Sequence, residues 1–135
     1  MAQMEISFPG NQKVNASLNG FEIRTDQPAE GGGEGSAPAP FDLFLASLGT
    51  CAGIYAISFF QNRRLNAEGF KMTLDFSWNE EKHLLDKISF TLTLPKDFPE
   101  KYIPALKKSV ELCTVKRTLA EPPEFETRTT KQSPA

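Results

Sequence analysis

The N-terminal part of the chain contains three short segments in which apolar and polar residues alternate. They cover residues 4–8, 14–18 and 21–24. A period of two predicts β-strands that keep one face in solvent. Asn19-Gly20 separates the second segment from the third, and this dipeptide is a strong signal for a two-residue hairpin turn. We therefore expect a small antiparallel sheet at this end of the chain.

A long uncharged segment follows the loop DQPAEGGGEGSAPAP, which is too rich in glycine and proline to form a regular element. A helix can begin at Pro40, since the first turn of any helix leaves its N–H groups unpaired. The 18 residues 43–60 carry no charge, and this length meets the threshold for a membrane span. Small and polar residues interrupt the segment, among them Ser47, Gly49 and Thr50. We therefore predict a helix buried by other elements and no membrane association.

Two further alternating segments and a second helical pattern fill the rest of the chain. Residues 70–78 and 88–94 each place apolar side chains on even positions, and together they predict a hairpin joined through NEEKH. Beyond it, apolar residues recur at helical steps of three and four, at Ile103, Leu106, Val110 and Cys113. A last strand is expected over 125–130. The order βββ, α, ββ, α, β predicts an α+β fold, with antiparallel sheet on one side and two helices on the other.

Length and charge narrow the class of protein. At 135 residues the chain is expected to form a single domain, 1–135. Its net charge of −2 and its scattered Lys and Arg residues provide no basic face for a nucleic acid. Two cysteines are too few for a disulfide-stapled secreted scaffold, and the N-terminus shows no signal-peptide pattern. We therefore expect a cytoplasmic protein without a nucleic-acid partner.

The two cysteines are the residues with the clearest chemical potential. Cys51 lies at the centre of the first predicted helix, and Cys113 lies on the apolar face of the second, 62 positions later (113 − 51). If the two helices pack on each other, the thiols can meet, which suggests thiol chemistry. A pair of structural cysteines fits the same pattern, because free cysteine is a common small core residue. A reactive Cys51 needs a neighbouring cation to stabilise its thiolate, and periodicity does not choose among the candidates Lys13, Arg24, Lys116 and Arg117.

Other familiar sites lack the residues that they need. With one histidine, His83, and two well-separated cysteines, the chain has no ligand set for a zinc site. We expect neither a metal nor a cofactor. The three consecutive glycines 31–33 lack the following Lys and Ser or Thr of a phosphate-binding loop. Serine hydrolysis has no support, because the serines show no nucleophile-elbow pattern.

Two blocks of the sequence together resemble a known family. The block PxPFDLFLASLGTC, which ends at Cys51, is followed some sixty residues later by VELCTVKRTL around Cys113. With the glycine-rich loop and the strand order, these blocks are similar to the OsmC/Ohr superfamily, the osmotically induced and organic-hydroperoxide-resistance proteins. The resemblance covers most of the chain. It implies a tightly intertwined homodimer, with two central helices enclosed by sheet and active sites at the subunit interface.

The resemblance also implies roles for the cysteines. In the peroxidase members, the first cysteine attacks an organic hydroperoxide and becomes a sulfenic acid, which the second cysteine converts to a disulfide. By that resemblance Cys51 is the peroxidatic thiol and Cys113 the resolving one. A dithiol reductant, either a small molecule or a lipoyl- or thioredoxin-type protein, would return the pair to the reduced state.

The charged residues of the family match this chain less closely. Peroxidase members use an arginine from the N-terminal strands to hold the thiolate and a glutamate before the first helix to hold the arginine. Here Phe41 occupies the place of the glutamate, with Asp42 beside it, while Arg24 is nearest to the arginine in chemistry and Lys13 in position. We expect Arg24 and Asp42 to take these roles. The alternative is a non-peroxidatic dimer that binds a small apolar ligand or handles sulfur, as a persulfide or mixed disulfide, at Cys51.

Overall fold

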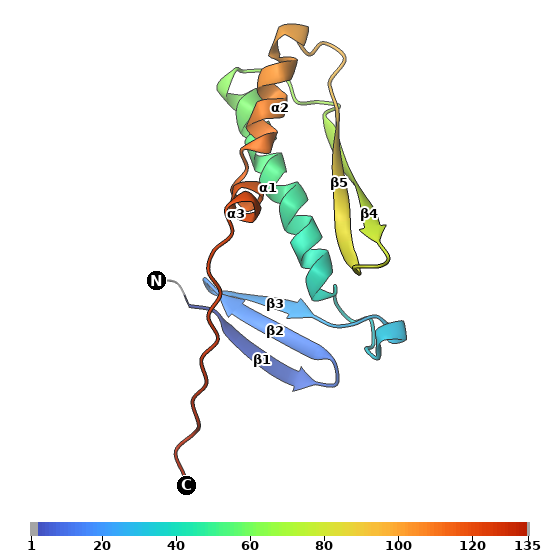
Figure 1. Cartoon of the computed structure of the whole chain (residues 1–135). Coiled ribbons are helices and arrows are strands. Elements are labelled where there is room, and N and C mark those ends of the chain that lie inside the picture. Colours follow the sequence, from blue (N-terminus) through green and yellow to red (C-terminus); the bar gives the residue numbers. More distant parts are fainter. Residues whose placement is uncertain (1–2, 135) are drawn as a thin grey trace. The chain divides into compact units, whose positions relative to one another are not determined.

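The structure is a computed structural model that describes residues 3–134 (Figure 1). The chain forms two compact units, divided between Thr50 and Cys51. This division lies inside the long helix α1, Pro40–Asn62. The first unit contains three strands, the loop after them and the beginning of α1. The second contains the rest of α1, a hairpin and two further helices.

An antiparallel three-stranded sheet opens the first unit, as the alternating segments predict. Its strands are β1 (Glu5–Gly10), β2 (Lys13–Leu18) and β3 (Phe21–Thr25), in the order β1-β2-β3. Leu18 pairs with Phe21, which leaves a two-residue turn between them. Asn19 and Gly20 have φ angles of 52° and 81°, and both values are required by the type I′ hairpin turn that Asn-Gly favours. The predicted turn is confirmed.

A buried carboxylate organises the loop that follows β3. Asp26 is fully buried, and it accepts backbone hydrogen bonds from Gln27, Glu34 and Ser36, together with the Ser36 hydroxyl. These bonds tie the beginning of the loop to its end, around the short 3₁₀ helix η1 (Ala29–Gly31). The glycine-rich segment is therefore a loop, as predicted, and it has a defined conformation because one carboxylate satisfies four donors.

The long helix α1 begins at the predicted Pro40 and runs for 23 residues. The Asp42 carboxylate accepts a hydrogen bond from the backbone N–H of Ala39 at 3.2 Å, and negative charge favours the N-terminal end of a helix. By length and composition α1 meets the criterion for a membrane span, as core helices of soluble proteins also do, and 28% of its most apolar 18-residue window is buried within this chain. The helix therefore leaves much of its apolar surface uncovered by its own chain.

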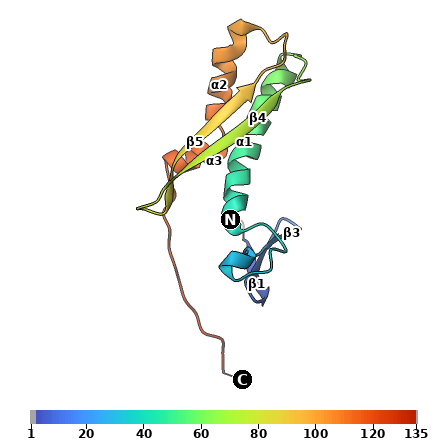
Figure 2. The same cartoon turned by 90° about the vertical axis from the view of Figure 1, so that its right-hand side faces the viewer.

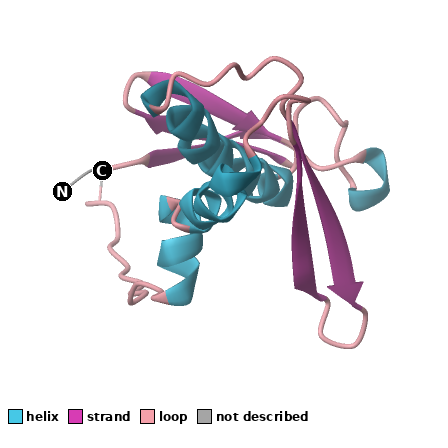
Figure 3. Ribbon diagram, turned by 90° about the horizontal axis from the view of Figure 1, so that it is seen from above, coloured by secondary structure: helices cyan, strands magenta, loops and turns pink. Residues whose placement is uncertain are grey.

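The second unit begins with the second half of α1 and a long antiparallel hairpin. The strands are β4 (Lys71–Asn79) and β5 (Leu84–Thr93), and Figures 1 and 2 show them running alongside α1 and α2. In Figure 3 they form one long ribbon that ends in a turn. His83 belongs to that turn, where it is exposed and has a φ angle of 55°. The predicted hairpin is confirmed, and His83 is solvated in its turn.

Two short helices complete the second unit. They are α2 (Ile103–Glu111), entered through the 3₁₀ helix η2 (Glu100–Tyr102), and α3 (Thr114–Ala120). Figures 1 and 2 show α2 beside the C-terminal half of α1. Between these elements lies a core cluster of seven buried residues, namely Ala52, Ala56, Phe59, Phe60, Leu106, Val110 and Cys113. Antiparallel sheets together with helices confirm the α+β fold class.

Two features differ from the expectation. The helical pattern is broken at Cys113, which has the extended angles φ −60° and ψ 147° and separates α2 from α3, so the prediction of a helical Cys113 is wrong. Residues 121–134 contain neither helix nor strand, although the sequence predicts a strand over 125–130. An alternating segment needs a neighbouring strand to satisfy its backbone groups, and within this described chain none pairs with it. Phe125 accordingly leaves 87% of its surface exposed.

Gly33 provides a test of the loop conformation. A Cβ atom at this position would overlap the carbonyl oxygen of Gln27 and lie 2.7 Å from Asp26 Oδ1. We expect Gly33→Ala to lower the free energy of unfolding by at least about 2 kcal/mol, because backbone atoms have to move. Chemical denaturation at one protein concentration measures this difference.

Gly31→Ala is the matched control in the same loop. A Cβ atom there meets its nearest neighbours at 3.6–3.7 Å, which is an ordinary contact. We expect a change of no more than about 1 kcal/mol in either direction. Equal destabilisation by the two substitutions would contradict the close approach of Gly33 to Gln27.

Candidate functional site

Cys51 lies near the middle of α1, beside the buried face of that helix. Ala52 and Ala56 define this face and are fully buried. Cys51 itself is partly buried and packs against the core cluster. Its position is therefore fixed by close packing, while part of its surface stays accessible. A thiol with those two properties can meet a small molecule without leaving the core.

Cys113 is a member of the core cluster to which Cys51 packs. It is fully buried, and its thiol is free, as is that of Cys51. The residue caps the N-terminus of α3, so its backbone carbonyl accepts a hydrogen bond from Arg117 N–H at 3.0 Å. The break at Cys113 gives its side chain a direction that a continuous helix would not provide. The second unit thus carries one accessible thiol and one shielded thiol around a common core.

A chain of polar side chains links α1 to the segment that holds Cys113. The hydroxyl oxygens of Tyr55 and Thr114 are 3.1 Å apart and share a hydrogen bond. Arg117 donates to Thr114 Oγ1 from Nη2 at 3.4 Å and to the carbonyl oxygen of Leu112 from Nε at 2.9 Å. The sequence analysis did not predict these hydrogen bonds. The available signal was that Tyr55 lies four residues after Cys51 and Thr114 directly after Cys113.

The cations that the sequence offers for Cys51 have other partners in this structure. In the second unit, Lys116 Nζ lies 3.7 Å from the centre of the Phe90 ring, while Arg117 makes the hydrogen bonds described above. In the first unit, Lys13 forms an ion pair with Glu34. Arg24 Nε lies 3.2 Å from the carboxylate of Glu22. Each of these contacts stabilises the cation where it stands.

Arg24 and Asp42, the two other predicted site residues, both belong to the first unit. There the Asp42 carboxylate binds the backbone N–H of Ala39 and the Arg24 guanidinium binds Glu22. Arg24 also lines a groove of the first unit, together with Lys13 and Ser36. The ion pair between Arg24 and Asp42 that the resemblance suggests stays a prediction.

A groove of about 390 Å³ lies along α1 beyond Cys51. Its walls are Ile54, Tyr55, Ser58, Phe59, Asn62, Arg63 and Ser109. The Arg63 guanidinium stacks on the Phe59 ring at 3.7 Å, so apolar walls lead to a positive charge. Phe60 packs against Phe70 and Phe98 in the core cluster, to which Phe59 also belongs. The groove has the character of a site for a small apolar molecule.

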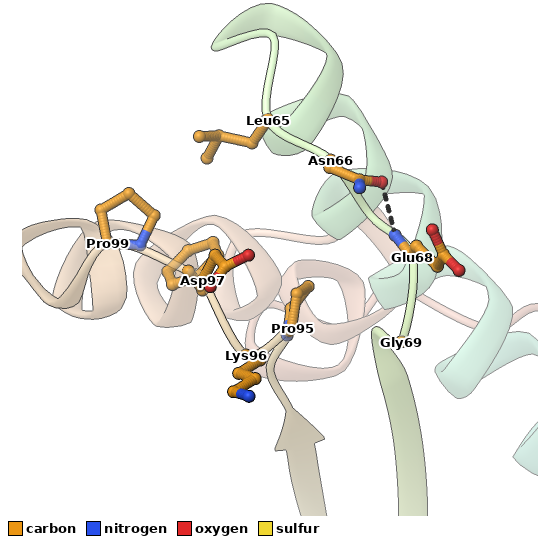
Figure 4. A pocket seen from close by; sticks show the side chains of 9 residues that line it. Leu65, Asn66, Glu68, Gly69, Pro95, Lys96, Asp97 and Pro99 are labelled. Atoms are coloured by element: carbon orange, nitrogen blue, oxygen red, sulfur yellow. Dashed lines mark hydrogen bonds between the residues drawn. The ribbon is translucent and has the colours of Figure 1, made fainter.

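A second pocket, of about 430 Å³, lies between the loops that follow α1 and β5 (Figure 4). Asn66 accepts a hydrogen bond from the backbone N–H of Glu68 at 2.9 Å at its rim. The lining residues include Lys96 and Asp97 but neither cysteine. Among residues 3–134, no group of three His, Cys, Asp or Glu side chains could hold a metal ion. The two free thiols of the second unit are the candidate reactive groups.

Comparison with known proteins now identifies the family. The family described as OsmC-like protein matches residues 33–128, which is 96 of the 135 residues (128 − 33 + 1) and includes both cysteines. The chain belongs to the OsmC-like family. No curated protein sequence matches it.

Solved structures share the fold of this OsmC-like protein. It is similar to a candidate osmotic stress induced and detoxification response protein from Psychrobacter arcticus 273-4, with a TM-score of 0.73 and 18% identity, covering 87% of this chain and 88% of that one. It is also similar to an OsmC-like protein from Mycoplasma pneumoniae, with a TM-score of 0.70 and 15% identity, covering 89% of this chain and 87% of that one. For an organic hydroperoxide resistance protein from Bacillus subtilis, the TM-score is 0.52 and the identity 18%, covering 87% of this chain and 90% of that one. At these identities the likeness establishes the fold.

The family match begins at Gly33, inside the loop that Asp26 organises. The Ser36 hydroxyl, with the backbone N–H groups of Ser36, Gln27 and Glu34, lowers the pKa of the Asp26 carboxyl from 3.8 to about 2, although burial acts in the opposite direction. Hydrogen bonds to the charged form therefore outweigh desolvation at this carboxylate. The loop before α1 of this OsmC-like protein depends on an ionised Asp26.

We expect an acid-dependent loss of stability from this carboxylate. Because the folded pKa of Asp26 lies below its ordinary value, the contribution of Asp26 is fully present above about pH 4 and is lost as the pH falls through about 2. Asp26→Asn should lower the free energy of unfolding at pH 7 and flatten its decline between pH 4 and 2. Urea unfolding of both proteins across this range measures the difference.

Asp86→Asn controls for the removal of one negative charge, since Asp86 is exposed on β5. It should leave the stability at pH 7 within about 0.5 kcal/mol of the wild type. Parallel pH curves for the wild type and Asp26→Asn would contradict the assigned role of Asp26.

Proposed function

We propose that this OsmC-like protein is a thiol-dependent peroxidase that reduces organic hydroperoxides through a Cys51/Cys113 redox pair. The observation that carries the proposal is an accessible thiol packed against a core cluster that contains a second, fully buried thiol. A peroxidatic thiol has to meet its substrate, whereas a resolving thiol can stay shielded until the first is oxidised. Membership of the OsmC-like family supports the same redox role.

The reaction has three steps. The Cys51 thiolate attacks the hydroperoxide, forming an S–O bond and breaking the O–O bond, and the alkoxide leaves as an alcohol after taking up a proton. The Cys113 sulfur then attacks the Cys51 sulfenic acid, forming an S–S bond and releasing water. A dithiol reductant, a small molecule or a lipoyl- or thioredoxin-type protein, restores both thiols by two exchange steps and becomes a disulfide itself.

The groove beside α1 supports an apolar substrate. Tyr55 and Phe59, four and eight residues after Cys51, form aromatic walls. Burial of apolar surface there would favour an alkyl or aryl hydroperoxide over hydrogen peroxide. We propose that Arg24 stabilises the thiolate and that Asp42 orients Arg24, as the resemblance to the peroxidase members implies.

Peroxide titration tests this function. We expect one equivalent of cumene hydroperoxide to remove both thiols of the reduced protein and to lower its intact mass by about 2 Da, because a disulfide replaces two S–H groups. Cys51→Ser should be inert. Cys113→Ser should complete one turnover and stop at a Cys51 sulfenic acid, which dimedone traps.

Two outcomes would contradict this function, one for the roles of the cysteines and one for the activity itself. Equal loss of the single turnover in both variants would contradict the division of roles between Cys51 and Cys113. A wild-type protein that stays folded and keeps both thiols would contradict peroxidase activity as such.

We also propose a cytoplasmic homodimer in which the two units of each chain form one OsmC-like domain. Large apolar side chains are exposed in the single chain, among them Ile6, Phe8, Phe21, Ile54 and Phe125. Exposed apolar surface on this scale marks an interface, and the uncovered part of α1 adds to it. A second copy would cover these side chains and give the segment 125–130 a strand to pair with.

Light scattering tests the assembly. We expect a mass of about 30 kDa (2 × 15.0 kDa) that persists on dilution to micromolar concentration. Ile54→Lys should shift the mass toward the monomer, whereas Glu68→Gln, on an exposed loop, should not. A stable wild-type monomer would contradict the intertwined arrangement.

The second candidate function is a dimer that binds a small apolar ligand or carries a persulfide or mixed disulfide at Cys51. The groove favours it, because apolar walls ending at Arg63 suit an amphiphilic ligand whether or not peroxide is reduced. Absence of peroxide turnover, together with saturable binding of a fluorescent fatty acid, would favour this function.

A further inference from the structure

We propose that Tyr55, Thr114 and Arg117 form a positioning bridge that holds the Cys113 segment against α1 and so favours formation of the Cys51–Cys113 disulfide. This inference rests on the proposed redox pair and names residues that act on its closure. Tyr55 and Thr114 share a hydrogen bond at 3.1 Å, and Arg117 donates to Thr114 at 3.4 Å. None of the three has to touch the peroxide for this role.

The first step of the argument is the place of the bridge on α1. Tyr55 lies four residues after Cys51, so the two side chains share one helical face and are separated by about 6 Å along the axis. Thr114 directly follows Cys113. The hydrogen bond between Tyr55 and Thr114 therefore joins the immediate surroundings of one thiol to those of the other.

The second step is the break at Cys113. An interior helical residue is held by the hydrogen bonds of its own helix, but Cys113 separates α2 from α3 in an extended conformation. Side chains supply restraint on both sides of it. Arg117 Nε binds the Leu112 carbonyl before Cys113 at 2.9 Å, and the Thr114 hydroxyl after Cys113 is held by Tyr55 and Arg117.

The third step is the geometry of a disulfide. The two Cα atoms have to come within about 4.4–6.8 Å with a restricted torsion about the S–S bond. Cys51 is fixed in the middle of a long helix, so adjustment falls to the Cys113 segment. A bridge that keeps this segment on the Cys51 face of α1 raises the effective concentration of the Cys113 thiol. A single hydrogen bond of ordinary strength changes such an equilibrium by about threefold to tenfold.

The closing experiment measures the disulfide without peroxide. In glutathione buffers, the protein dithiol reacts with oxidised glutathione to give the Cys51–Cys113 disulfide and two reduced glutathiones. When half of the protein is oxidised, the squared concentration of reduced glutathione divided by that of oxidised glutathione gives the effective concentration of the pair. Thr114→Val removes the hydroxyl and keeps the branched shape, whereas Thr114→Ser keeps the hydroxyl. We expect Thr114→Val to lower the effective concentration about threefold to tenfold, and Thr114→Ser to stay within about twofold of the wild type.

Tyr55→Phe removes the same hydrogen bond by deleting the hydroxyl of its other partner. It should reproduce most of the loss in Thr114→Val, which also removes the bond from Arg117 to Thr114. The double variant should lose no more than Thr114→Val alone, because the two hydroxyls share one interaction. Tyr102→Phe removes the hydroxyl of the other tyrosine, whose ring packs against Phe59, and should behave as the wild type. Circular dichroism and light scattering establish that each variant is folded and has the wild-type mass.

A kinetic readout separates positioning from general loss of structure. Thr114→Val should form the Cys51 sulfenic acid with cumene hydroperoxide at the wild-type rate, and close the disulfide about threefold to tenfold more slowly. Wild-type closure in Thr114→Val, faster closure, or an equal loss in Thr114→Ser would overturn the bridge. Additive losses in the double variant would overturn it as well.

The two proposals fail in different ways. A wild-type protein that ignores peroxide but forms the disulfide in glutathione, with the expected loss in Thr114→Val, contradicts the peroxidase and upholds the bridge. A protein that turns over peroxide with Thr114→Val unaffected contradicts the bridge and upholds the peroxidase. A wild-type pair that closes in neither assay overturns both.

Discussion

The close approach of α1 to the other elements of the second unit is the constraint on which the rest of that unit depends. Ala52 and Ala56 make the approach possible, because both are fully buried and neither carries a side chain beyond Cβ. Leu106 and Val110 of α2 fill the same core cluster. Interiors packed at this density transmit displacements. The contacts that stabilise the unit therefore also fix the position of Cys51, which adjoins Ala52, and of Cys113, which is part of the cluster.

The break between α2 and α3 gives the two thiols different backbone surroundings. Cys51 inherits the rigidity of a 23-residue helix, whereas Cys113 sits between two short helices and depends on side chains for its restraint. A resolving thiol has to move toward an oxidised partner, and a residue at a break can do so at smaller cost than one inside a helix. In the proposed cycle, this break would let the restrained Cys113 segment adjust toward Cys51, which stays in place on its helix.

Local signals account for the parts of the fold that sequence predicted well. Alternation, the Asn19-Gly20 turn and the helix start at Pro40 each depend on a few neighbouring residues, and the structure confirms them. The strand expected over 125–130 failed because alternation describes one strand and cannot supply its neighbour. The prediction of a helical Cys113 failed for a related reason. Steps of three and four place Cys113 on an apolar face, but its side chain is equally well buried in the core when the helix is broken there. The hydrogen bond between Tyr55 and Thr114 joins residues 59 positions apart (114 − 55), so only their spacing from the two cysteines could have indicated it.

The proposed peroxidase needs a cation that stabilises the Cys51 thiolate. Lys116 would have to leave the face of Phe90, and Arg117 would have to give up the Leu112 carbonyl and the Thr114 hydroxyl. Arg24 is bound in a weaker way. Its partner Glu22 is an exposed side chain, and an ion pair in water contributes little because both charges are well solvated. The proposed role of Arg24 therefore requires the loss of a weaker contact than a role of Lys116 or Arg117 would.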